Sequence, residues 1–160
     1  MKVELSASEA SAPRPSIRIR RGRRTDYDEL SALCGWPGVD QSSRRSIRLF
    51  RNVVSDLAYD IYVADDNGSP VGMVAVSYAR VLALGGQRAT LEDVVVRPDR
   101  RGAGLGRRLI EFVLRRAVKR GARVFEAHPR DDSAERFLGR TGFHPSGRRY
   151  ERSLTVERMG

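Results

Sequence analysis

The chain has 160 residues, of which 40% are hydrophobic and 31% charged, and this composition is typical of a single soluble globular domain. No stretch reaches the roughly eighteen apolar residues of a membrane span, and the N-terminus lacks the apolar run of a signal peptide, so we expect a cytoplasmic protein. The single cysteine, Cys34, excludes an internal disulfide and a multi-thiolate zinc site. Because His128 and His144 are isolated in the sequence, we expect no metal site.

The formal charge of +10 is concentrated in two segments. Residues 1–24 carry seven basic and two acidic side chains, and residues 97–123 carry ten basic and two acidic side chains, while the rest of the chain is slightly acidic. Such blocks suit the phosphate backbone of a nucleic acid or a phosphorylated cofactor bound at one site. The charge distribution alone leaves both alternatives open.

Residues 1–15 are rich in Ser, Ala and Pro and show no periodicity, so we expect a disordered leader followed by a single domain over residues 16–160. The sequence SIRIRRG at 16–22 alternates apolar and basic residues and predicts a half-buried strand. Thr25 and Asp26 then offer an N-cap for a short helix that ends at the Gly and Pro residues of 35–38.

A second amphipathic helix is predicted from Gln41 to Leu57, because its apolar residues recur at spacings of three and four. Its outer face carries arginines. Three antiparallel strands follow in a meander, at 61–65, 71–82 and 89–96, joined by glycine-containing turns.

After Pro98 the period changes from two to that of a helix, which Gly121 ends. The remaining predicted elements are a strand at 122–128, a short helix at 133–141 and a strand at 148–156.

The glycine-rich segment RRGAGLGRRL, residues 100–109, joins a predicted strand to a predicted helix that has no Ser, Asp or Asn cap. The amides around Gly102, Gly104 and Gly106 are therefore open to a phosphate, which a helix N-terminus attracts. A dinucleotide fingerprint is disfavoured because its last glycine falls on Arg107, and no Gly-Lys-Ser/Thr follows to make a P-loop. The alternative is a plain helix-starting turn with solvated arginines.

Over residues 16–156 the sequence resembles the GCN5-related N-acetyltransferase (GNAT) family, through LEDVVVRPDRRGAGLGRRL and a later Arg-Thr-Gly-Phe. The stretch RGAGLG at 101–106 is similar to the family's R-x-x-G-x-G signature. The resemblance implies an α/β fold with a mixed, mostly antiparallel sheet and about four helices. It also implies a V-shaped split between parallel strands at 89–96 and 122–127, where acetyl-CoA lies.

The resemblance implies a cofactor site for acetyl-CoA by position. The loop amides hold the pyrophosphate, while Val94 and Val96 bond the pantetheine arm and polarise the thioester carbonyl. The expected cofactor contacts are Val94, Val95, Val96, Arg101, Gly102, Gly104, Leu105, Gly106, Arg107 and Ser133. The tract at 91–96 is also similar to glucosamine-6-phosphate N-acetyltransferases, without fixing the substrate. The sequence departs from the family where many members have a tyrosine that protonates the leaving thiolate, since Leu138 stands there.

An amine with a pKa near 10.4 costs about 4.6 kcal/mol to deprotonate at pH 7, so the reaction needs a base or an ordered water. Strand alternation places Glu92 on the face of Val94 and Val96, and Asp93 on the opposite face, so Glu92 is the expected base. The alternative is a structural carboxylate paired with a neighbouring arginine. Asp93 and Glu126 are the other candidates for the base.

The leaving thiolate needs less help, because a thiol pKa near 8.5 limits the gain from an acid to about 2 kcal/mol. Tyr150, Ser133 or water would replace the missing tyrosine. Trp36 lies in the loop between the two predicted helices, and the resemblance implies that this region shapes the acceptor pocket. The alternative is that Trp36 packs in the core. Apolar edge strands make a homodimer plausible.

The sequence thus predicts an acetyl-CoA-dependent N-acetyltransferase that acts on a primary amine of a small molecule or protein. Transfer is expected to be direct, since Cys34 has no evident activating partner. Two alternatives remain: an acyl-CoA sensor without transfer activity, and an arginine-rich nucleic-acid-binding protein that uses the helix at 44–51 and the N-terminal arm. We favour the enzyme over nucleic-acid binding and expect no membrane partner.

Overall fold

The computed structural model describes residues 17–37 and 39–147. The chain divides into two compact units, one extending to His128 and one beginning at Pro129. The leader predicted at 1–15 and the strand predicted at 148–156 lie outside the described residues. Among the helices that are described, none is long and apolar enough to cross a bilayer.

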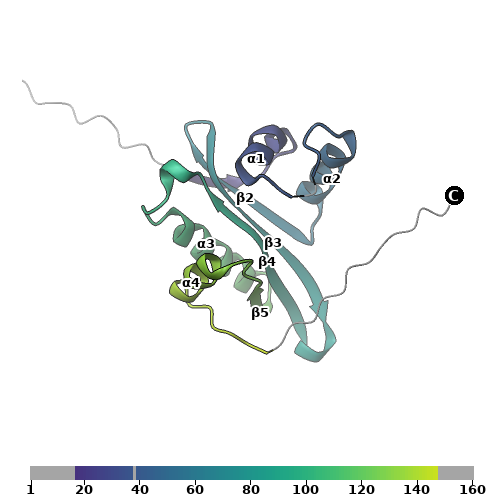
Figure 1. Ribbon diagram of the computed structural model, residues 1–160. Coiled ribbons are helices and arrows are strands. Elements are labelled where there is room, and N and C mark those ends of the chain that lie inside the picture. Colours follow the sequence, from purple (N-terminus) through teal and green to yellow (C-terminus); the bar gives the residue numbers. More distant parts are fainter. Residues whose placement is uncertain (1–16, 38, 148–160) are drawn as a thin grey trace, which may run out of the picture. The chain divides into compact units, whose positions relative to one another are not determined.

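The first unit contains a sheet that, in the described part of the chain, has five strands in sequence order. Neighbouring strands pair antiparallel from β1 to β4, and β4 and β5 pair parallel (Figure 1). The strands are β1 (Arg18–Arg21), β2 (Tyr59–Asp66), β3 (Ser69–Val81), β4 (Gly86–Val96) and β5 (Ala122–Ala127). The predicted class, a mixed and mostly antiparallel α/β sheet, is confirmed.

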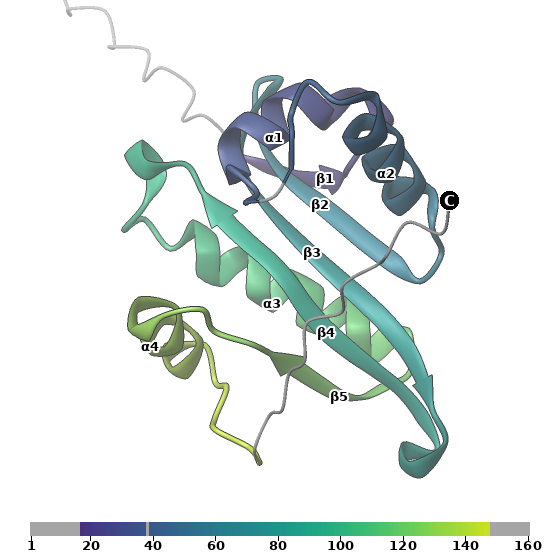
Figure 2. The ribbon, with the colours of Figure 1, turned by 45° about the vertical axis from the view of Figure 1, so that its right-hand side comes forward.

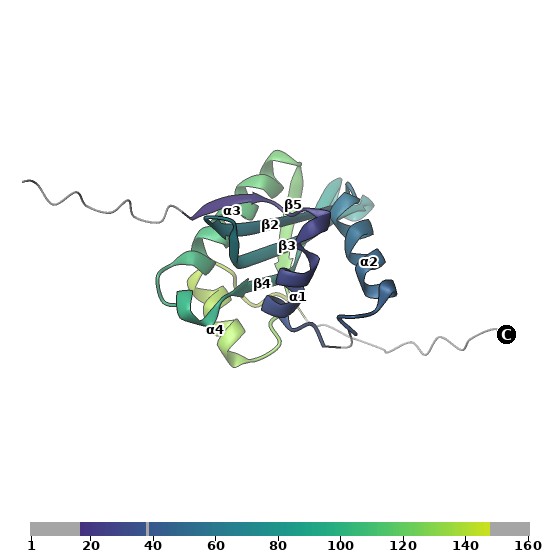
Figure 3. The ribbon, with the colours of Figure 1, turned by 90° about the horizontal axis from the view of Figure 1, so that it is seen from above.

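Helices cover both faces of this sheet, with α1 and α2 on one side and α3 on the other (Figures 2 and 3). The helices of the first unit are α1 (Tyr27–Cys34), α2 (Arg44–Ser55) and α3 (Leu105–Lys119). The second unit contains α4 (Asp132–Arg140). Short 3₁₀ turns stand at η1 (Arg24–Asp26), η2 (Leu82–Leu84) and η3 (Pro98–Arg100).

Helix α2 begins three residues later than its apolar pattern predicts. Ser43 is the N-cap, and its hydroxyl accepts a hydrogen bond from the Arg45 amide at 3.2 Å. Gln41, predicted to begin the helix, instead bonds back to α1: its side-chain amide donates to the Ser31 carbonyl, and its own carbonyl accepts from the Tyr27 hydroxyl. These contacts hold the α1–α2 connection against the helix that precedes it.

The core forms on both sides of the sheet. On one face, Met73 and Ala75 of β3 pack with buried residues of α1 and α2, including Leu30 and Phe50. On the other face, α3 approaches closely because β3 has Gly72, where a Cβ would lie only 3.3 Å from Leu109. Strand β3 is therefore buried on both sides and anchors the sheet.

Arg20 on β1 links the first strand to α1 and to the β2–β3 turn. Its guanidinium contacts Asp26 at 2.8 Å and Asp65 at 2.6 Å, and all three side chains are at most 11% exposed. Asp26 was predicted to cap α1, and it does stand at the N-cap position, but its carboxylate makes no capping bond to that helix. It accepts instead from Arg20 and from the Arg23 amide.

We predict that Arg20→Met lowers the free energy of unfolding by about 3 kcal/mol, because it leaves two nearly buried carboxylates without their cation. Arg20 holds the pKa of Asp65 below its usual value. The stabilisation from that pair is present at neutral pH and is lost as the pH falls through the depressed pKa. In urea unfolding, the gap between wild type and variant should narrow below about pH 4, where the carboxylates begin to protonate.

Arg107→Met is the control, because the Arg107–Glu111 ion pair is exposed on both sides. It should change the unfolding free energy by less than about 1 kcal/mol. Equal losses in the two variants would contradict the structural role given to Arg20.

Candidate functional site

The parallel pairing of β4 with β5 stops before β4 ends. The last paired residues are Leu91 and Ala127, while β4 continues to Val96. Figure 2 shows the two strands close together at their first residues and diverging toward their carboxyl ends. This geometry agrees with the predicted V-shaped split between these two strands.

A β-bulge at Glu92 changes the faces predicted for this part of β4. Ala75 pairs with Asp93 and Val76 pairs with Leu91, so Glu92 is an extra residue on β4. Its carboxylate accepts a hydrogen bond from the hydroxyl of Ser77. The prediction that Glu92 shares a face with Val94 and Val96 is therefore wrong, because the extra residue shifts the alternation by one position.

The main chains of Val94 and Val96 point toward the open side of the split. The Arg97 amide donates to the Val71 carbonyl at 2.9 Å, and successive residues of an antiparallel strand point alternately toward and away from their partner. Val94 and Val96 therefore turn their N–H and C=O groups away from β3. Val95 turns its groups toward β3, and its side chain packs against the core below α1 and α2.

The glycine loop takes the conformation that the sequence requires. Gly102 and Gly104 both have φ of 80°, in the left-handed region that favours glycine. A Cβ at either position would meet no protein atom within 4 Å, so the space beside the loop is open. Gly104 is the N-cap of α3 and supplies no side-chain capping bond, which leaves the first amides of the helix directed at that space.

The remaining residues of the predicted signature have different environments. Leu105 is only 6% exposed, so its side chain belongs to the core, and its main chain is the part that faces the loop. Gly106 is half-buried in the first turn of α3. Arg101 donates from Nε to the Val96 carbonyl at 3.0 Å, and the exposed Arg107 pairs with Glu111 at 3.2 Å.

Two carboxylates of β4 lie on the sheet face that α1 and α2 cover, as their hydrogen-bond partners show. Glu92 is exposed and bonds Ser77, next to Tyr59, whose pKa is raised by burial and then by the charge of Glu92. Asp93 accepts a hydrogen bond from the Trp36 indole N–H at 2.8 Å. Ser77 and Tyr59 were not identified from the sequence, because the pairing of β3 with β4 brings Ser77 beside Glu92 and the pairing of β2 with β3 brings Tyr59 beside Ser77.

The other predicted site residues lie in the second unit or beyond the described chain. Ser133 is exposed in the first turn of α4, after the N-cap Asp131. Leu138, which replaces the family's tyrosine, is the buried residue of that helix. Tyr150 lies outside the described residues.

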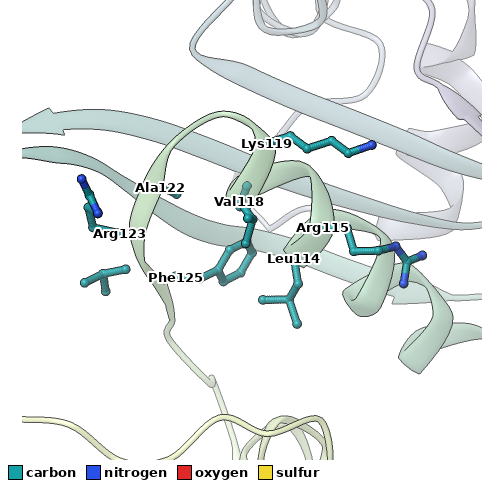
Figure 4. Close-up of a pocket in the computed structure, with 9 residues that line it drawn as sticks. Leu114, Arg115, Val118, Lys119, Ala122, Arg123 and Phe125 are labelled. Carbon is teal, nitrogen blue, oxygen red and sulfur yellow. The ribbon is translucent and has the colours of Figure 1, made fainter.

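A hollow of about 480 Å³ lies between the C-terminal half of α3 and β5 (Figure 4). Its apolar surface includes Val118 and Val124, which are 73% and 40% exposed, and its edge carries Arg115, Lys119 and Arg123. The glycine loop stands at the other end of α3, roughly 20 Å away along a helix of this length. The hollow is thus separate from the predicted cofactor site.

A sheet whose parallel pair separates before a glycine loop and a bare helix N-terminus is the arrangement of the acyl-CoA N-acyltransferase fold. The model of the Acetyltransferase (GNAT) family matches residues 26–143, and the chain belongs to this family. No curated protein sequence matches the chain.

Solved structures with the same fold include a transcriptional regulator from Bacillus halodurans C-125, with 23% identity and a TM-score of 0.76 over 87% of this chain and 100% of that one. Glucosamine-6-phosphate N-acetyltransferase from Arabidopsis thaliana has 20% identity and a TM-score of 0.75 over 88% and 99%. An aminoglycoside acetyltransferase from an uncultured soil metagenomic sample, in complex with sisomicin, has 15% identity and a TM-score of 0.73 over 88% and 97%. At these identities the similarity concerns the fold.

Cys34 lies close to the candidate site, and its surroundings make its thiol unreactive. Its thiol donates to the Met73 sulfur at 3.1 Å. Burial, and then the charge of Asp93, raise the pKa of Cys34 to about 12. A thiol with this pKa is almost entirely protonated at neutral pH and is a poor nucleophile.

We predict that iodoacetamide alkylates Cys34 at pH 8 at least about a hundredfold more slowly than it alkylates an unperturbed thiol, because the thiolate is scarce. Intact-mass measurements over time give the rate. The same protein in 6 M urea is the control and should react at the ordinary rate. Equal rates in the folded and unfolded protein would show that Cys34 is accessible and ionisable.

Proposed function

We propose that the protein is an acetyl-CoA-dependent N-acetyltransferase that transfers the acetyl group directly to a primary amine of a small molecule or protein. The observation that carries the proposal is the combination of the open glycine loop with the unpaired end of β4. Membership of the GNAT family supports the same reaction. Acetyl-CoA supplies the acetyl group as a thioester.

The loop and helix α3 suit the phosphates of this co-substrate. The amides of Gly102, Gly104, Gly106 and Arg107 lie at the positive end of the helix dipole, and the space beside Gly102 and Gly104 is open. Arg101 adds a full charge at the start of the loop. A pyrophosphate there would accept hydrogen bonds from the helix amides that have no side-chain cap.

The end of β4 suits the pantetheine arm and the thioester. Val94 and Val96 offer main-chain groups on the open side, as a strand offers them to an added neighbour. The Val94 amide is the proposed donor to the thioester oxygen, where negative charge develops during acyl transfer. Val95 has no part in this contact, because its main chain faces β3.

Glu92 is the proposed base. It is exposed on the face opposite to the α3 core, and Ser77 fixes its carboxylate by a hydrogen bond. The carboxylate accepts the proton that the amine loses, directly or through water, and the amine nitrogen then forms the amide bond as the carbon–sulfur bond breaks. The proton needed by the leaving thiolate comes from water or from Ser133 or Tyr150.

The binding half of the proposal is tested by Gly104→Ala. The added Cβ strains the left-handed backbone by about 1 kcal/mol and enters the space proposed for the phosphates. We expect the dissociation constant for acetyl-CoA, measured by calorimetry, to rise at least about tenfold, since a factor of ten corresponds to 1.4 kcal/mol.

Gly85→Ala is a matched control, because Gly85 also has a positive φ, of 58°, and open space around its Cβ position. It stands in the turn before β4, so it should lose similar stability and bind acetyl-CoA as wild type does. If both variants bind alike, the loop is not the phosphate site.

The chemical half is tested by Glu92→Gln. We expect kcat at pH 7 to fall at least about a hundredfold, as for loss of a general base. The deficit in kcat should shrink as the pH approaches the pKa of the free amine, because the substrate then deprotonates without help. Thiol release from acetyl-CoA gives the rate, and Glu29→Gln on the exposed side of α1 is the control.

The same assay on wild type separates the enzyme from the acyl-CoA sensor. Binding of acetyl-CoA without thiol release across amino sugars, amino acids, polyamines and lysine peptides would identify a sensor and exclude the enzyme. In the variant, an unchanged rate for Glu92→Gln would exclude Glu92 as the base while leaving the proposed reaction intact.

A further inference from the structure

Helix α2 carries four arginines, and its own segment offers nothing to balance them. Residues 41–55 contain no aspartate or glutamate. The side chains of Arg44, Arg45, Arg48 and Arg51 are all exposed. Within the described part of the chain, none of these four guanidinium groups forms an ion pair or a hydrogen bond. The outer face of α2 therefore presents four unneutralised positive charges.

The placement of these arginines opposes two rules of helix stability. Arg44 and Arg45 occupy the first turn of α2, where the positive end of the helix dipole repels cations. Arg48 follows them at spacings of four and three residues, and like charges at these spacings destabilise a helix. Arg51 adds one more such neighbour. Local choices that cost stability without a visible partner are typical of a functional surface.

The four side chains lie on one face of the helix. At 3.6 residues per turn they fall within about 120° of the circumference, away from Phe50 and the core. Ser55 lies in the same sector, and its hydroxyl accepts a hydrogen bond from Nε of Arg24 at 2.9 Å. Arg24 therefore continues the row beyond α2, along about 16 Å of helix. We call this row the arginine stripe: Arg24, Arg44, Arg45, Arg48 and Arg51.

The arginine stripe is separate from the proposed acetyl-CoA site. Helix α2 lies on the same side of the sheet as α1, whereas the glycine loop precedes α3 on the opposite side (Figures 2 and 3). The phosphates of a ligand bound at that loop would not reach the stripe. The charge of α2 therefore needs another explanation.

The chemistry of the stripe fits phosphate groups. A guanidinium matches the oxygens of a phosphate with two parallel hydrogen bonds. Double-stranded DNA carries one charge per roughly 1.7 Å of its axis, so a stripe of about 16 Å faces several phosphates at once. A membrane surface would instead take up an apolar helix face beside the charges. That face of α2 is packed in the core, where Phe50 is 7% exposed.

We propose that the arginine stripe is a docking surface for the phosphate backbone of a nucleic acid. Contacts to phosphates carry no direct sequence information, so the stripe holds the backbone without selecting a base sequence. This interaction is additional to acetyl transfer and does not depend on it. Because the stripe and the glycine loop lie on opposite sides of the sheet, one chain can carry both functions.

The test measures binding of the full chain to a fluorescein-labelled DNA duplex of about 20 base pairs, and to a single-stranded RNA of about 20 nucleotides, by anisotropy. The logarithm of the association constant should fall with the logarithm of salt concentration with a slope of about −4, as for five phosphate contacts. Binding of either nucleic acid with this slope supports the stripe. Absence of such binding for both would overturn it.

The double variant Arg44→Gln, Arg48→Gln locates the contact. Losing two phosphate contacts should reduce the slope by about two and weaken binding about sixtyfold at 0.1 M salt. The double variant Arg115→Gln, Lys119→Gln is the matched control, because it removes the same charge from exposed positions on α3. It should bind within about threefold of wild type. Equal weakening of the two variants would assign the binding to the net charge of +10 and overturn the stripe.

Competition separates the stripe from other ligands and from the proposed function. Saturating acetyl-CoA should leave nucleic-acid binding unchanged, whether or not the protein transfers acetyl groups. Displacement by acetyl-CoA would place the nucleic acid at the glycine loop. Polyglutamate or phosphatidylserine vesicles that compete as well as nucleic acid at equal charge would identify an acidic protein or a membrane as the partner. Each of these results would overturn the proposal.

The variant Arg44→Glu tests why the arginines are there. It removes a cation from the first turn of α2, adds an anion at the positive end of the dipole and faces Arg48 one turn later. We expect Tm at or above that of wild type, together with weaker binding of the DNA duplex. A lower Tm would show that Arg44 stabilises the fold, and unchanged DNA binding would exclude it from the contact. Either result would contradict the proposal.

Discussion

Strand β4 has a neighbour on both sides only as far as Leu91, and the candidate site depends on this limit. Before that point its main chain is paired with β3 and β5, and beyond it the β5 side is open. One extra residue, Glu92, separates the part of β4 that is paired on both sides from the part that is paired on one side. The bulge turns a carboxylate toward Ser77 and leaves the next main-chain groups at the free edge. A strand without the extra residue could provide either the carboxylate beside Ser77 or the main-chain groups at the free edge, but not both.

Much of the fold follows from hydrophobic periodicity. The predicted strands and helices are present among the described residues, with ends that differ by a few positions, because burial on one or two faces determines the pattern of β3 or α3 over many residues. The start of α2 was predicted less well, since its cap at Ser43 is a local hydrogen bond and not a periodic feature. The bulge was missed for a related reason: it is a single-residue event. Two successive acidic residues, Glu92 and Asp93, between the apolar Leu91 and Val94 were the available signal.

The positive charge of the segment 97–123 is partly neutralised by acidic side chains inside and outside the segment, and only the pairing inside it can be predicted from the sequence. Arg107 pairs with Glu111 one helical turn away, as their spacing of four residues in the sequence predicts. Arg100 pairs with Asp66 and Arg120 with Asp60, across 34 and 60 residues. These partners lie outside the segment, so its excess charge overstates what remains for a ligand.

The glycine loop was predicted well because backbone freedom is a local property of glycine.

The Arg101–Val96 hydrogen bond has a consequence for the energetics of ligand binding. It closes a short ring between the last residue of β4 and the first residue of the glycine loop. A carbonyl oxygen has two lone pairs, so this bond leaves the Val96 oxygen able to accept another. The loop is thus restrained before any ligand arrives, and the entropy of ordering it is lost during folding. Preorganisation of this kind makes binding less dependent on induced fit.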